Sequence, residues 1–278
     1  MIYVLSFRAN KRTGGPVVPG RLESGPDLGT KESLQMAPKV TVLLHGFNVD
    51  YKTGRATLLR FAKLLPSAAN GAVIAALWPG DHGLGALSYS FEGRDADDTA
   101  LELARFLGDV LMPTVSIAFV AHSLGCRVAM ETAARLVAQG HTPEQICLLA
   151  AAIDDDSLAA TDAYLAATDN SARVAALSSR QDKVLKLAYP VGDLLQAFLF
   201  ADDTADLALG YHGARPHKRS GTAVPENVLD ERIPKRKSRR DRVGHGDYLP
   251  SQQTNQKQRA AARFADAVLA GVEDPRYG

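Results

Sequence analysis

The stretch from Ser116 to Gly125 constrains the fold of this chain more than any other. Residues 117–121 are apolar almost without interruption, as a parallel strand buried on both faces requires. Beyond Gly125, apolar residues recur at helical spacing to about Gln139. The turn between strand and helix carries Ser123, with alanine two residues before it and glycine two residues after it. Such a turn lifts the serine hydroxyl above the sheet edge in a strained backbone conformation, where large neighbours would collide. The pattern therefore predicts a nucleophile elbow.

Apolar runs of strand length alternate with helical patterns along the rest of the chain. The predicted strands cover 2–7 (an edge strand), 40–44, 72–78, 146–153, 173–178 and 228–230 (a second edge strand). The predicted helices cover 53–65, 95–110, 157–167, most of 183–200, and 257–270. This alternation predicts an α/β fold, with a mostly parallel, doubly wound sheet and helices on both faces. In such a sheet the ligand chemistry lies at the carboxyl ends of the strands.

A chain of 278 residues fits one large α/β domain, so we expect 1–278 to form a single domain. Within it, 1–38 would supply an edge strand and an irregular segment, and 231–243 a basic loop. The connection between Ile153 and Arg173 is short, and we therefore expect a small or absent cap over the site.

Composition narrows the class of partner and compartment. The net charge of +1 gives no overall field that would attract nucleic acid or an anionic membrane. Two cysteines, Cys126 and Cys147, provide no disulfide framework, which suits a reducing compartment. No stretch reaches the roughly 20 apolar residues of a membrane helix, and the order of apolar and basic residues at the start is wrong for a signal peptide. We expect a cytoplasmic location, and composition does not indicate an oligomeric state.

Three polar residues follow strands whose carboxyl ends meet at one edge of the predicted sheet. Ser123 follows the central strand, Asp182 follows the strand two steps later, and His245 follows the last strand. Attack by a serine hydroxyl on a carbonyl needs a base, and imidazole suits that role near neutral pH. A carboxylate on the other ring nitrogen fixes the tautomer of the imidazole. The order Ser, Asp, His is the one expected of this fold, so these residues are predicted to form a catalytic triad.

Two backbone N–H groups complete the predicted machinery. The sequence His45-Gly46-Phe47-Asn48 ends the strand at 40–44 and is expected to expose the Phe47 N–H. With the Leu124 N–H at the start of the elbow helix, it would form an oxyanion hole.

Other residues compete for the base and acid roles. His212 and His217 are alternatives to His245, but they lie in a poorly specified loop. The aspartates at 154–156 also end a strand and are alternatives to Asp182, although such clusters are more often helix caps and solvated charge. His45 is interpreted as support for the Phe47 loop, and His122 as a packing or pocket-wall residue without a role in proton transfer.

With these motifs in place, the sequence resembles the α/β-hydrolase superfamily, and within it a bacterial branch of serine hydrolases of unassigned substrate. The resemblance covers about Val40 to the C-terminal helix. The motifs that carry it are Leu44-His45-Gly46-Phe47-Asn48, Ala76-Leu77-Trp78-Pro79, Ala121-His122-Ser123-Leu124-Gly125, Ser178-Ser179-Arg180-Gln181-Asp182 and Gly244-His245. The resemblance implies that Ser123, Asp182 and His245 are nucleophile, acid and base, and that neither a metal nor an organic cofactor takes part. The chain departs from the pattern at Ala121, where glycine is usual, and in the long basic segment before His245.

These features predict a serine hydrolase that cleaves a small-molecule carboxylic ester through an acyl-enzyme. Trp78, Tyr89 and Phe91 are candidates for lining the substrate pocket. The same machinery would serve a thioesterase or an amidase. A non-catalytic binding protein of the same fold is a further alternative, although such proteins usually lack one of the triad groups. The basic run at 234–240 is interpreted as a solvated loop, or as a contact for an anionic partner or substrate.

Overall fold

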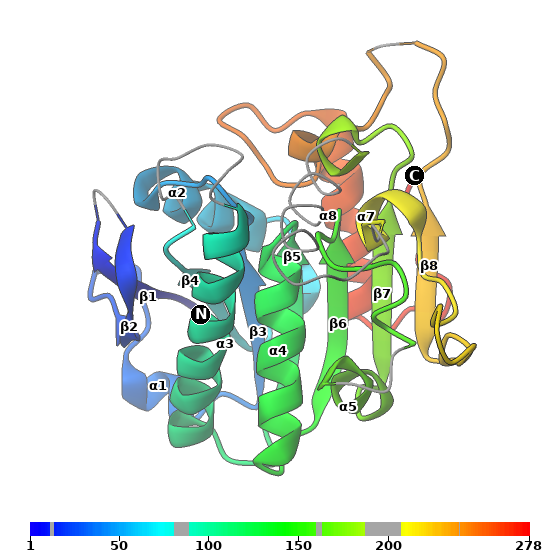
Figure 1. Cartoon of the computed structure of the whole chain (residues 1–278). Helices are drawn as coiled ribbons and strands as arrows, with labels where there is room; N and C mark the ends of the chain where they lie inside the picture. The colour runs from blue at the N-terminus through cyan, green and yellow to red at the C-terminus, as the bar shows by residue number, and fades with distance from the viewer. Residues whose placement is uncertain (12–13, 81–88, 160–162, 187–206, 239) are drawn as a thin grey trace.

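A single sheet of eight strands organises the molecule, in the order β2-β1-β4-β3-β5-β6-β7-β8 (Figure 1). The computed structural model describes residues 1–11, 14–80, 89–159, 163–186, 207–238 and 240–278. The strands are β1 (Ile2–Asn10), β2 (Gly14–Leu22), β3 (Lys39–Leu44), β4 (Ala72–Leu77), β5 (Ser116–His122), β6 (Pro143–Leu149), β7 (Arg173–Ser178) and β8 (Val228–Arg232). Every neighbouring pair is parallel except β1 and β2. The predicted mostly parallel sheet is confirmed.

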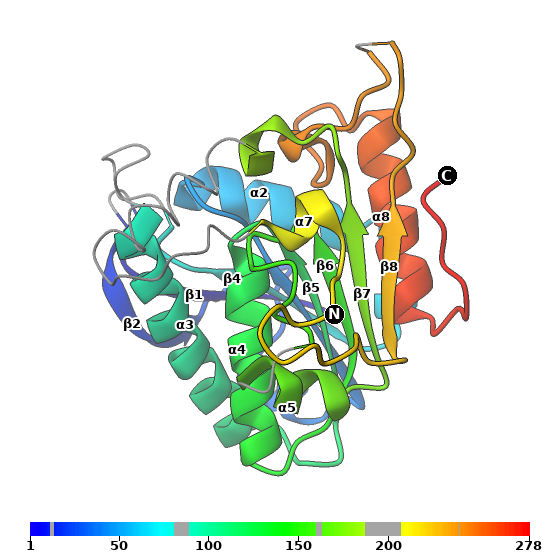
Figure 2. The same cartoon turned by 45° about the vertical axis from the view of Figure 1, so that its right-hand side comes forward.

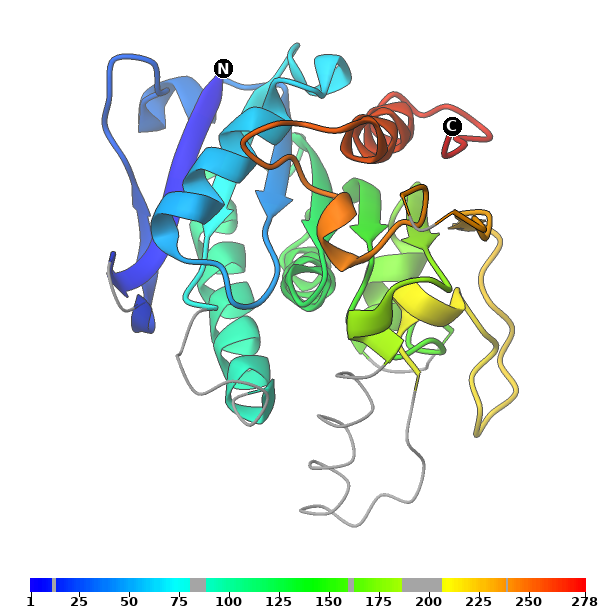
Figure 3. The same cartoon turned by 90° about the horizontal axis from the view of Figure 1, so that it is seen from above.

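Helices cover both faces of this sheet, as the alternation of elements predicts. The α-helices are α1 (Lys31–Gln35), α2 (Tyr51–Ala62), α3 (Tyr89–Val110), α4 (Gly125–Ala138), α5 (Ala163–Asp169), α7 (Leu209–His212) and α8 (Gln256–Leu269), with short 3₁₀ turns at Pro66–Ala68 and His245–Asp247. Figure 3 shows α2 and α8 on one face and α3, α4 and α5 on the other. The doubly wound arrangement is therefore confirmed as well.

The central strands are apolar because both of their faces are covered. In β4 every residue is buried, and in β3 and β5 only the first residue is partly exposed. A parallel sheet with helices on both faces leaves no solvent-facing side, which removes the need for alternating polar residues. The buried core built around these strands positions the carboxyl ends of β3, β5, β6 and β7 side by side, as the strand order requires.

The N-terminal third differs from its prediction. Residues 2–7 were expected to form an edge strand, but β1 lies inside the sheet, between β2 and β4. Part of the segment expected to be irregular is the strand β2, which returns antiparallel to β1 and becomes the edge. Turn-forming glycine and proline residues in 14–22 hide this strand from a periodicity reading.

Several elements differ from their predicted extents, among them α2, α3, α5 and β6. The helix predicted to start at Asp95 begins six residues earlier, at Tyr89. Of the helix predicted over 183–200, residues 183–186 are helical, and the rest lies outside the described residues. Within the described part of the chain, no helix has both the length and the apolar character needed to cross a bilayer.

The short connection between β6 and β7 contains α5 as its only α-helix in the described residues. The longer connection runs from β7 to β8, and residues 187–206 of it lie outside the described part. Within this connection, Ala208 forms an isolated antiparallel bridge with Asp154, which follows β6.

Candidate active site

The turn after β5 holds Ser123 in a left-handed conformation that only a few non-glycine residues adopt. Its φ is +55°. The backbone around it is fully used: the Ser123 N–H donates to the Leu149 carbonyl at 3.0 Å, and its carbonyl accepts from the N–H groups of Cys126 and Ala152 at 3.0 and 3.2 Å. Positive φ at such a residue costs free energy that only a well-determined surrounding structure sustains. The backbone conformation predicted for the elbow is thus observed at Ser123.

Two glycines let the loop after β3, which carries Phe47, pack against the turn of Ser123. A Cβ atom on Gly125 would lie 2.3 Å from the His45 carbonyl oxygen, and one on Gly46 would lie 2.8 Å from the Ser123 Cβ. Both distances are shorter than van der Waals contact, so neither position has room for a side chain. The close approach brings the backbone of the Phe47 loop to the serine.

A continuous chain of hydrogen bonds joins Asp182, His245 and Ser123. The His245 Nδ1 lies 2.8 Å from the Asp182 Oδ2, and its Nε2 lies 2.8 Å from the Ser123 Oγ. A carboxylate only accepts, so Nδ1 carries the proton and Nε2 is left to accept from the serine hydroxyl. The structure therefore brings the three predicted residues together, in the order that proton transfer from serine to histidine requires.

Asp182 is fully buried and held by its own backbone turn. Its Oδ1 accepts from the N–H groups of Val184 and Leu185 at 3.0 and 3.1 Å, while its Oδ2 faces His245. The carboxylate acts as the cap of a helical turn at 183–186, which fixes its orientation. This capping role explains why the short turn after β7 can present the carboxylate accurately.

His245 lies on the long segment between β8 and α8, and contacts from elsewhere hold it. The Nε2–H of His122 donates to the His245 carbonyl at 2.9 Å, and the two rings are 4.9 Å apart. The Asp247 carboxylate accepts from the Gly244 N–H at 2.9 Å and pairs with Lys257 of α8 at 3.4 Å. Before the turn, the Ser179 hydroxyl donates to the Val243 carbonyl at 2.9 Å.

His122 is neutral in this environment. Burial, followed by the neighbouring His245, lowers the pKa of His122 to about 3. A neutral ring that donates from Nε2 has a bare Nδ1, so its tautomer is fixed by the bond to the His245 carbonyl. The sequence indicated only that His122 packs or lines a pocket. Its bond to the base-bearing turn depends on a contact 123 residues away, which no local pattern reveals.

The backbone donors predicted for an oxyanion hole have no acceptor in the described part of the chain. Neither the Phe47 N–H nor the Leu124 N–H donates a hydrogen bond to another described residue. Phe47 is half-buried, and Leu124 sits at the start of α4, where the helix presents its positive end.

Trp78 supports the Phe47 loop instead of lining a pocket, so its predicted role in substrate binding is wrong. The side chain is completely buried, its Nε1–H donates to the His45 carbonyl at 2.8 Å, and its ring stacks on His45 at 5.6 Å. A buried indole needs a partner for its N–H, and the carbonyl before the Phe47 loop provides it. Tyr89 and Phe91 are the other two residues predicted to line the substrate pocket, and their side chains lie outside the described part of the structure.

Arg8 of β1 is a site-supporting residue that sequence reasoning missed. Its guanidinium donates from Nε to the Trp78 carbonyl at 3.1 Å and from an Nη to the Val49 carbonyl at 2.7 Å. The residue is 5% exposed, so a buried cation links the N-terminal strand to the loop that carries Phe47. In the sequence, Arg8 looks like an ordinary charge after an apolar strand.

Asp155 and His212, which are the alternatives for the acid and the base, bond to each other and not to the residues of the candidate site. His212 Nδ1 lies 3.0 Å from the Asp155 Oδ2, and the Lys218 Nζ lies 3.1 Å from the Asp155 Oδ1. Asp155 is 2% exposed, which contradicts the interpretation of the 154–156 cluster as solvated charge. The loop at 207–218 folds over the cluster and supplies its partners, an arrangement that strand-end position alone does not predict.

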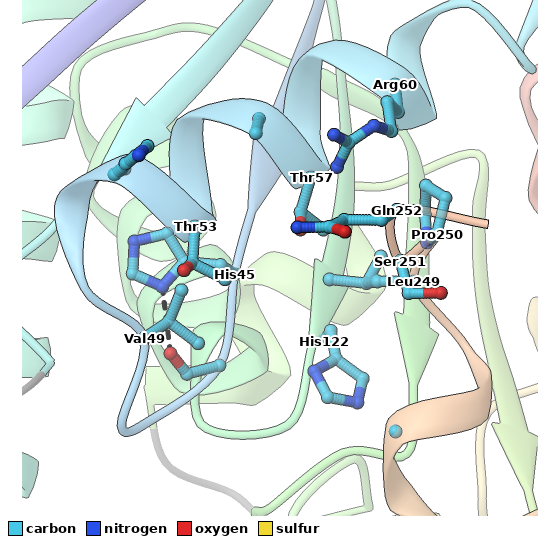
Figure 4. Close-up of a pocket in the computed structure, with 14 residues that line it drawn as sticks. His45, Val49, Thr53, Thr57, Arg60, His122, Leu249, Pro250, Ser251 and Gln252 are labelled. Atoms are coloured by element: carbon cyan, nitrogen blue, oxygen red, sulfur yellow. Dashed lines mark hydrogen bonds between the residues drawn. The ribbon is translucent and has the colours of Figure 1, made fainter. Parts of the chain in front are cut away.

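A cavity of about 580 Å³ adjoins these loops, between α2 and the chain after His245 (Figure 4). Its lining comprises His45, Gly46, Val49, Lys52, Thr53, Ala56, Thr57, Arg60, His122, Gly246, Leu249, Pro250, Ser251 and Gln252. Among the residues that the structure describes, no group of three or more His, Cys, Asp or Glu side chains could hold a metal ion.

The basic segment extends beyond the carboxyl edge of the sheet before the chain returns to α8 (Figures 1 and 2). Its side chains at 235–238 and 240 are exposed. Its backbone is tied to the turn that carries Asp182, because the Gln181 side chain donates to the Arg236 carbonyl at 2.8 Å and accepts from the Arg236 N–H at 2.9 Å. The side chains of this loop are thus exposed as predicted, but its backbone is held at Arg236 by Gln181.

Solved structures resemble this chain only distantly. An esterase from Pyrobaculum calidifontis is 16% identical, with 84% of this chain and 76% of that chain covered and a TM-score of 0.42. A metagenomic carboxyl esterase is 16% identical, with 93% and 77% covered and a TM-score of 0.36. A type II thioesterase of the yersiniabactin biosynthetic pathway is 14% identical, with 53% and 75% covered and a TM-score of 0.35. A search of curated proteins finds no match to this chain.

A family model gives a more direct assignment. The model described as "Alpha/beta hydrolase of unknown function (DUF900)" matches residues 27–195, which is more than half of the chain. This range contains the β3 loop, the elbow and Asp182, and it excludes β1, β2 and the segment that carries His245. The chain belongs to this family of α/β hydrolases.

Proposed function

We propose that this protein is a serine hydrolase that cleaves a carboxylic ester through an acyl-enzyme. The observation that carries the proposal is the pair of 2.8 Å contacts that join Asp182 to His245 and His245 to Ser123. Membership of an α/β-hydrolase family supports a hydrolytic reaction. The left-handed backbone at Ser123 supports its assignment as nucleophile, because strain of this kind persists where function requires it.

In the first half of the reaction, the Ser123 Oγ attacks the carbonyl carbon of the ester while its proton passes to the His245 Nε2. Asp182 accepts from the Nδ1–H and stabilises the imidazolium that forms. The N–H groups of Phe47 and Leu124 donate hydrogen bonds to the carbonyl oxygen and stabilise the negative charge that develops on it. The tetrahedral intermediate then expels the alcohol oxygen, which takes the proton from Nε2, and the acyl group remains on Ser123.

In the second half, water replaces the alcohol. His245 removes a proton from the attacking water, and the same two N–H groups stabilise the second tetrahedral intermediate. Collapse of that intermediate returns the proton to the Ser123 Oγ and releases the carboxylic acid. Each group therefore acts twice, and the cycle needs no group beyond the described residues and water.

Labelling with a fluorophosphonate probe tests the nucleophile, and a panel of esters tests the substrate. We expect one adduct, located on the peptide that contains Ser123 by mass spectrometry, and turnover of p-nitrophenyl esters that disappears once the adduct forms. A folded sample that neither reacts with the probe nor cleaves any ester would support a binding protein instead. Faster cleavage of a thioester or an anilide than of the matched ester would move the assignment to a thioesterase or an amidase.

A further inference from the structure

The cavity between α2 and the chain after His245 begins at the catalytic loops. Three of its lining residues are the immediate neighbours of the proposed machinery: Gly46 precedes Phe47, His122 precedes Ser123 and Gly246 follows His245. Its floor is thus made from the three loops that converge at the reacting atoms. A group bound there would lie next to these three loops.

Apolar side chains make up much of the cavity wall. Val49 and Ala56 come from the α2 side, and Leu249 and Pro250 from the chain after His245. Figure 4 shows Thr57 and Arg60 on α2 opposite Ser251 and Gln252. Such a wall favours a hydrocarbon chain, with polar groups left to fix one end of it.

The charges in the cavity are all positive. Lys52 and Arg60, both on α2, are the only charged side chains among its described lining residues. Neither forms an ion pair or a hydrogen bond through its side chain with another described residue, although Arg60 is half-buried. Arg55, on the same helix but outside the cavity, is paired with Glu23 at 3.2 Å. The cavity therefore contains two cations without a protein counter-charge.

Helix electrostatics explain only part of this arrangement. Arg60 lies in the last turn of α2, where the negative end of the helix favours a cation. Lys52 lies in the first turn, where the positive end disfavours one. The pair thus places positive charge along the α2 side of the cavity, although the helix dipole disfavours the charge of Lys52.

The two cations lie at different depths relative to the catalytic loops. A Cβ on Gly54 would lie 3.2 Å from the His45 Cδ2, so the start of α2 packs against the Phe47 loop. Arg60 is six residues further, or about 9 Å along the helix axis at 1.5 Å per residue. A linear ligand that runs beside α2 from the level of Gly54 to the level of Arg60 therefore spans about 9 Å.

We propose that this cavity selects an ester whose non-reacting end is a carboxylate, with Arg60 as its anchor. The inference rests on the proposed ester hydrolysis and narrows its substrate class. The hydrocarbon chain lies along the apolar wall, and the guanidinium of Arg60 binds the carboxylate through charge-assisted hydrogen bonds. Lys52, which is exposed, adds electrostatic attraction without fixing the ligand.

Two esters of equal length test the selection. The p-nitrophenyl monoester of suberate carries a terminal carboxylate, whereas p-nitrophenyl octanoate does not. We expect the wild type to cleave the suberate ester with the higher kcat/KM, and Arg60→Met to lower the ratio of the two values by about tenfold, as the loss of one partly exposed charged hydrogen bond predicts. Arg60→Lys should retain part of the preference. Lys63→Met, which removes an exposed cation at the end of the same helix, should leave the ratio unchanged.

The outcomes separate this inference from the function on which it rests. If the wild type cleaves the octanoate ester and Arg60→Met leaves the ratio unchanged, the carboxylate anchor is wrong and the hydrolase assignment stands. If neither ester is cleaved, the hydrolase assignment fails. Calorimetric titration of suberate itself then tests the cavity alone, with weaker binding to Arg60→Met than to Lys63→Met supporting the anchor and equal binding overturning it. Circular dichroism of each variant verifies that it is folded.

Discussion

Ser123 and His245 meet at one hydrogen bond, but the chain holds them by different means. Ser123 lies between β5 and α4. Its N–H donates to the Leu149 carbonyl at the end of β6, and its carbonyl accepts from Cys126 in α4 and from Ala152 after β6. Its conformation is the result of a strand, a turn and a helix that follow one another directly. The proposed nucleophile is thus fixed by an element that a short piece of sequence encodes.

His245 lies on a long segment after an edge strand and has no regular element of its own beyond a single 3₁₀ turn. Its orientation depends on the His122 bond to its carbonyl, on Asp182 at its Nδ1 and on the contact of Asp247 with Lys257. These partners come from β5, the β7 turn and α8. The proposed base is therefore positioned by long-range contacts, and a single substitution among its partners is expected to displace it.

Removal of either reacting group should have the largest effect. Ser123→Ala and His245→Gln should each lower kcat for a neutral ester by about 10⁵- to 10⁶-fold, since each leaves the other without a function. The double variant should be no slower than the worse of the two single variants. The measurement is steady-state hydrolysis with a labelled probe as a check on contaminating activity. A double variant whose loss equals the product of the two single losses would show that the residues act independently.

Substitution of Asp182, the proposed acid, should have the next largest effect on kcat. Asp182→Asn should lower kcat by about 10³- to 10⁴-fold, because an amide at this position favours the wrong tautomer of His245. Asp155→Asn is the matched control, since Asp155 is equally buried and also bonds a histidine, His212. It should lower stability through the contact with Lys218 and change kcat by less than about threefold. If the Asp155 variant were the inactive one, the assignment of Asp182 as acid would be wrong.

This difference between local and long-range support also explains what the sequence predicts. The elbow, the sheet and the three polar residues at strand ends could be predicted because each follows from a short pattern and from the rule that parallel strands share one edge. The burial of Trp78 could not, because the indole partner is the His45 carbonyl, 33 residues away. The same holds for Arg8, whose two carbonyl partners lie on different loops.

The hydrogen bond from His122 to the His245 carbonyl couples the turn of Ser123 to the turn of His245, and its loss should have a smaller effect than loss of the acid. His122→Phe keeps an aromatic ring beside His245 but removes the donor to its carbonyl, so the base-bearing turn loses one of its fixed points. We expect kcat for a neutral ester to fall by about 10- to 100-fold with little change in KM, by analogy with the cost of a misplaced catalytic group. His122→Gln, which retains an N–H donor, should recover part of the loss. Equal activity of the Phe variant and the wild type would mean that other contacts suffice to hold His245.

His122 should also make stability depend on pH in a defined window. Its folded pKa of about 3 lies below the unfolded value of about 6.5, so the unfolded chain binds the extra proton between these limits. The contribution of the neutral ring to stability is present above pH 6.5 and is lost as the pH falls toward 3. Urea unfolding of the wild type should show this loss, on the order of a few kcal/mol. In His122→Phe the acid limb of the pH dependence of stability should be flatter.

The smallest effect is expected where the base-bearing segment is most exposed. Serine at 235, 236, 237, 239 and 240 removes five positive charges, but the described side chains among these positions face solvent and pack against nothing that holds His245. Turnover of a neutral ester should therefore change by less than about twofold, since exposed charges act mainly on charged partners. Gln181→Ala is the contrasting variant, because it removes both hydrogen bonds to the Arg236 backbone and so frees the segment next to the Asp182 turn. That single neutral substitution should cost several-fold in kcat, more than all five charges together. If the charge variant were the slower one, the segment would act through its side chains, and the backbone tie to Gln181 would not be what supports the base.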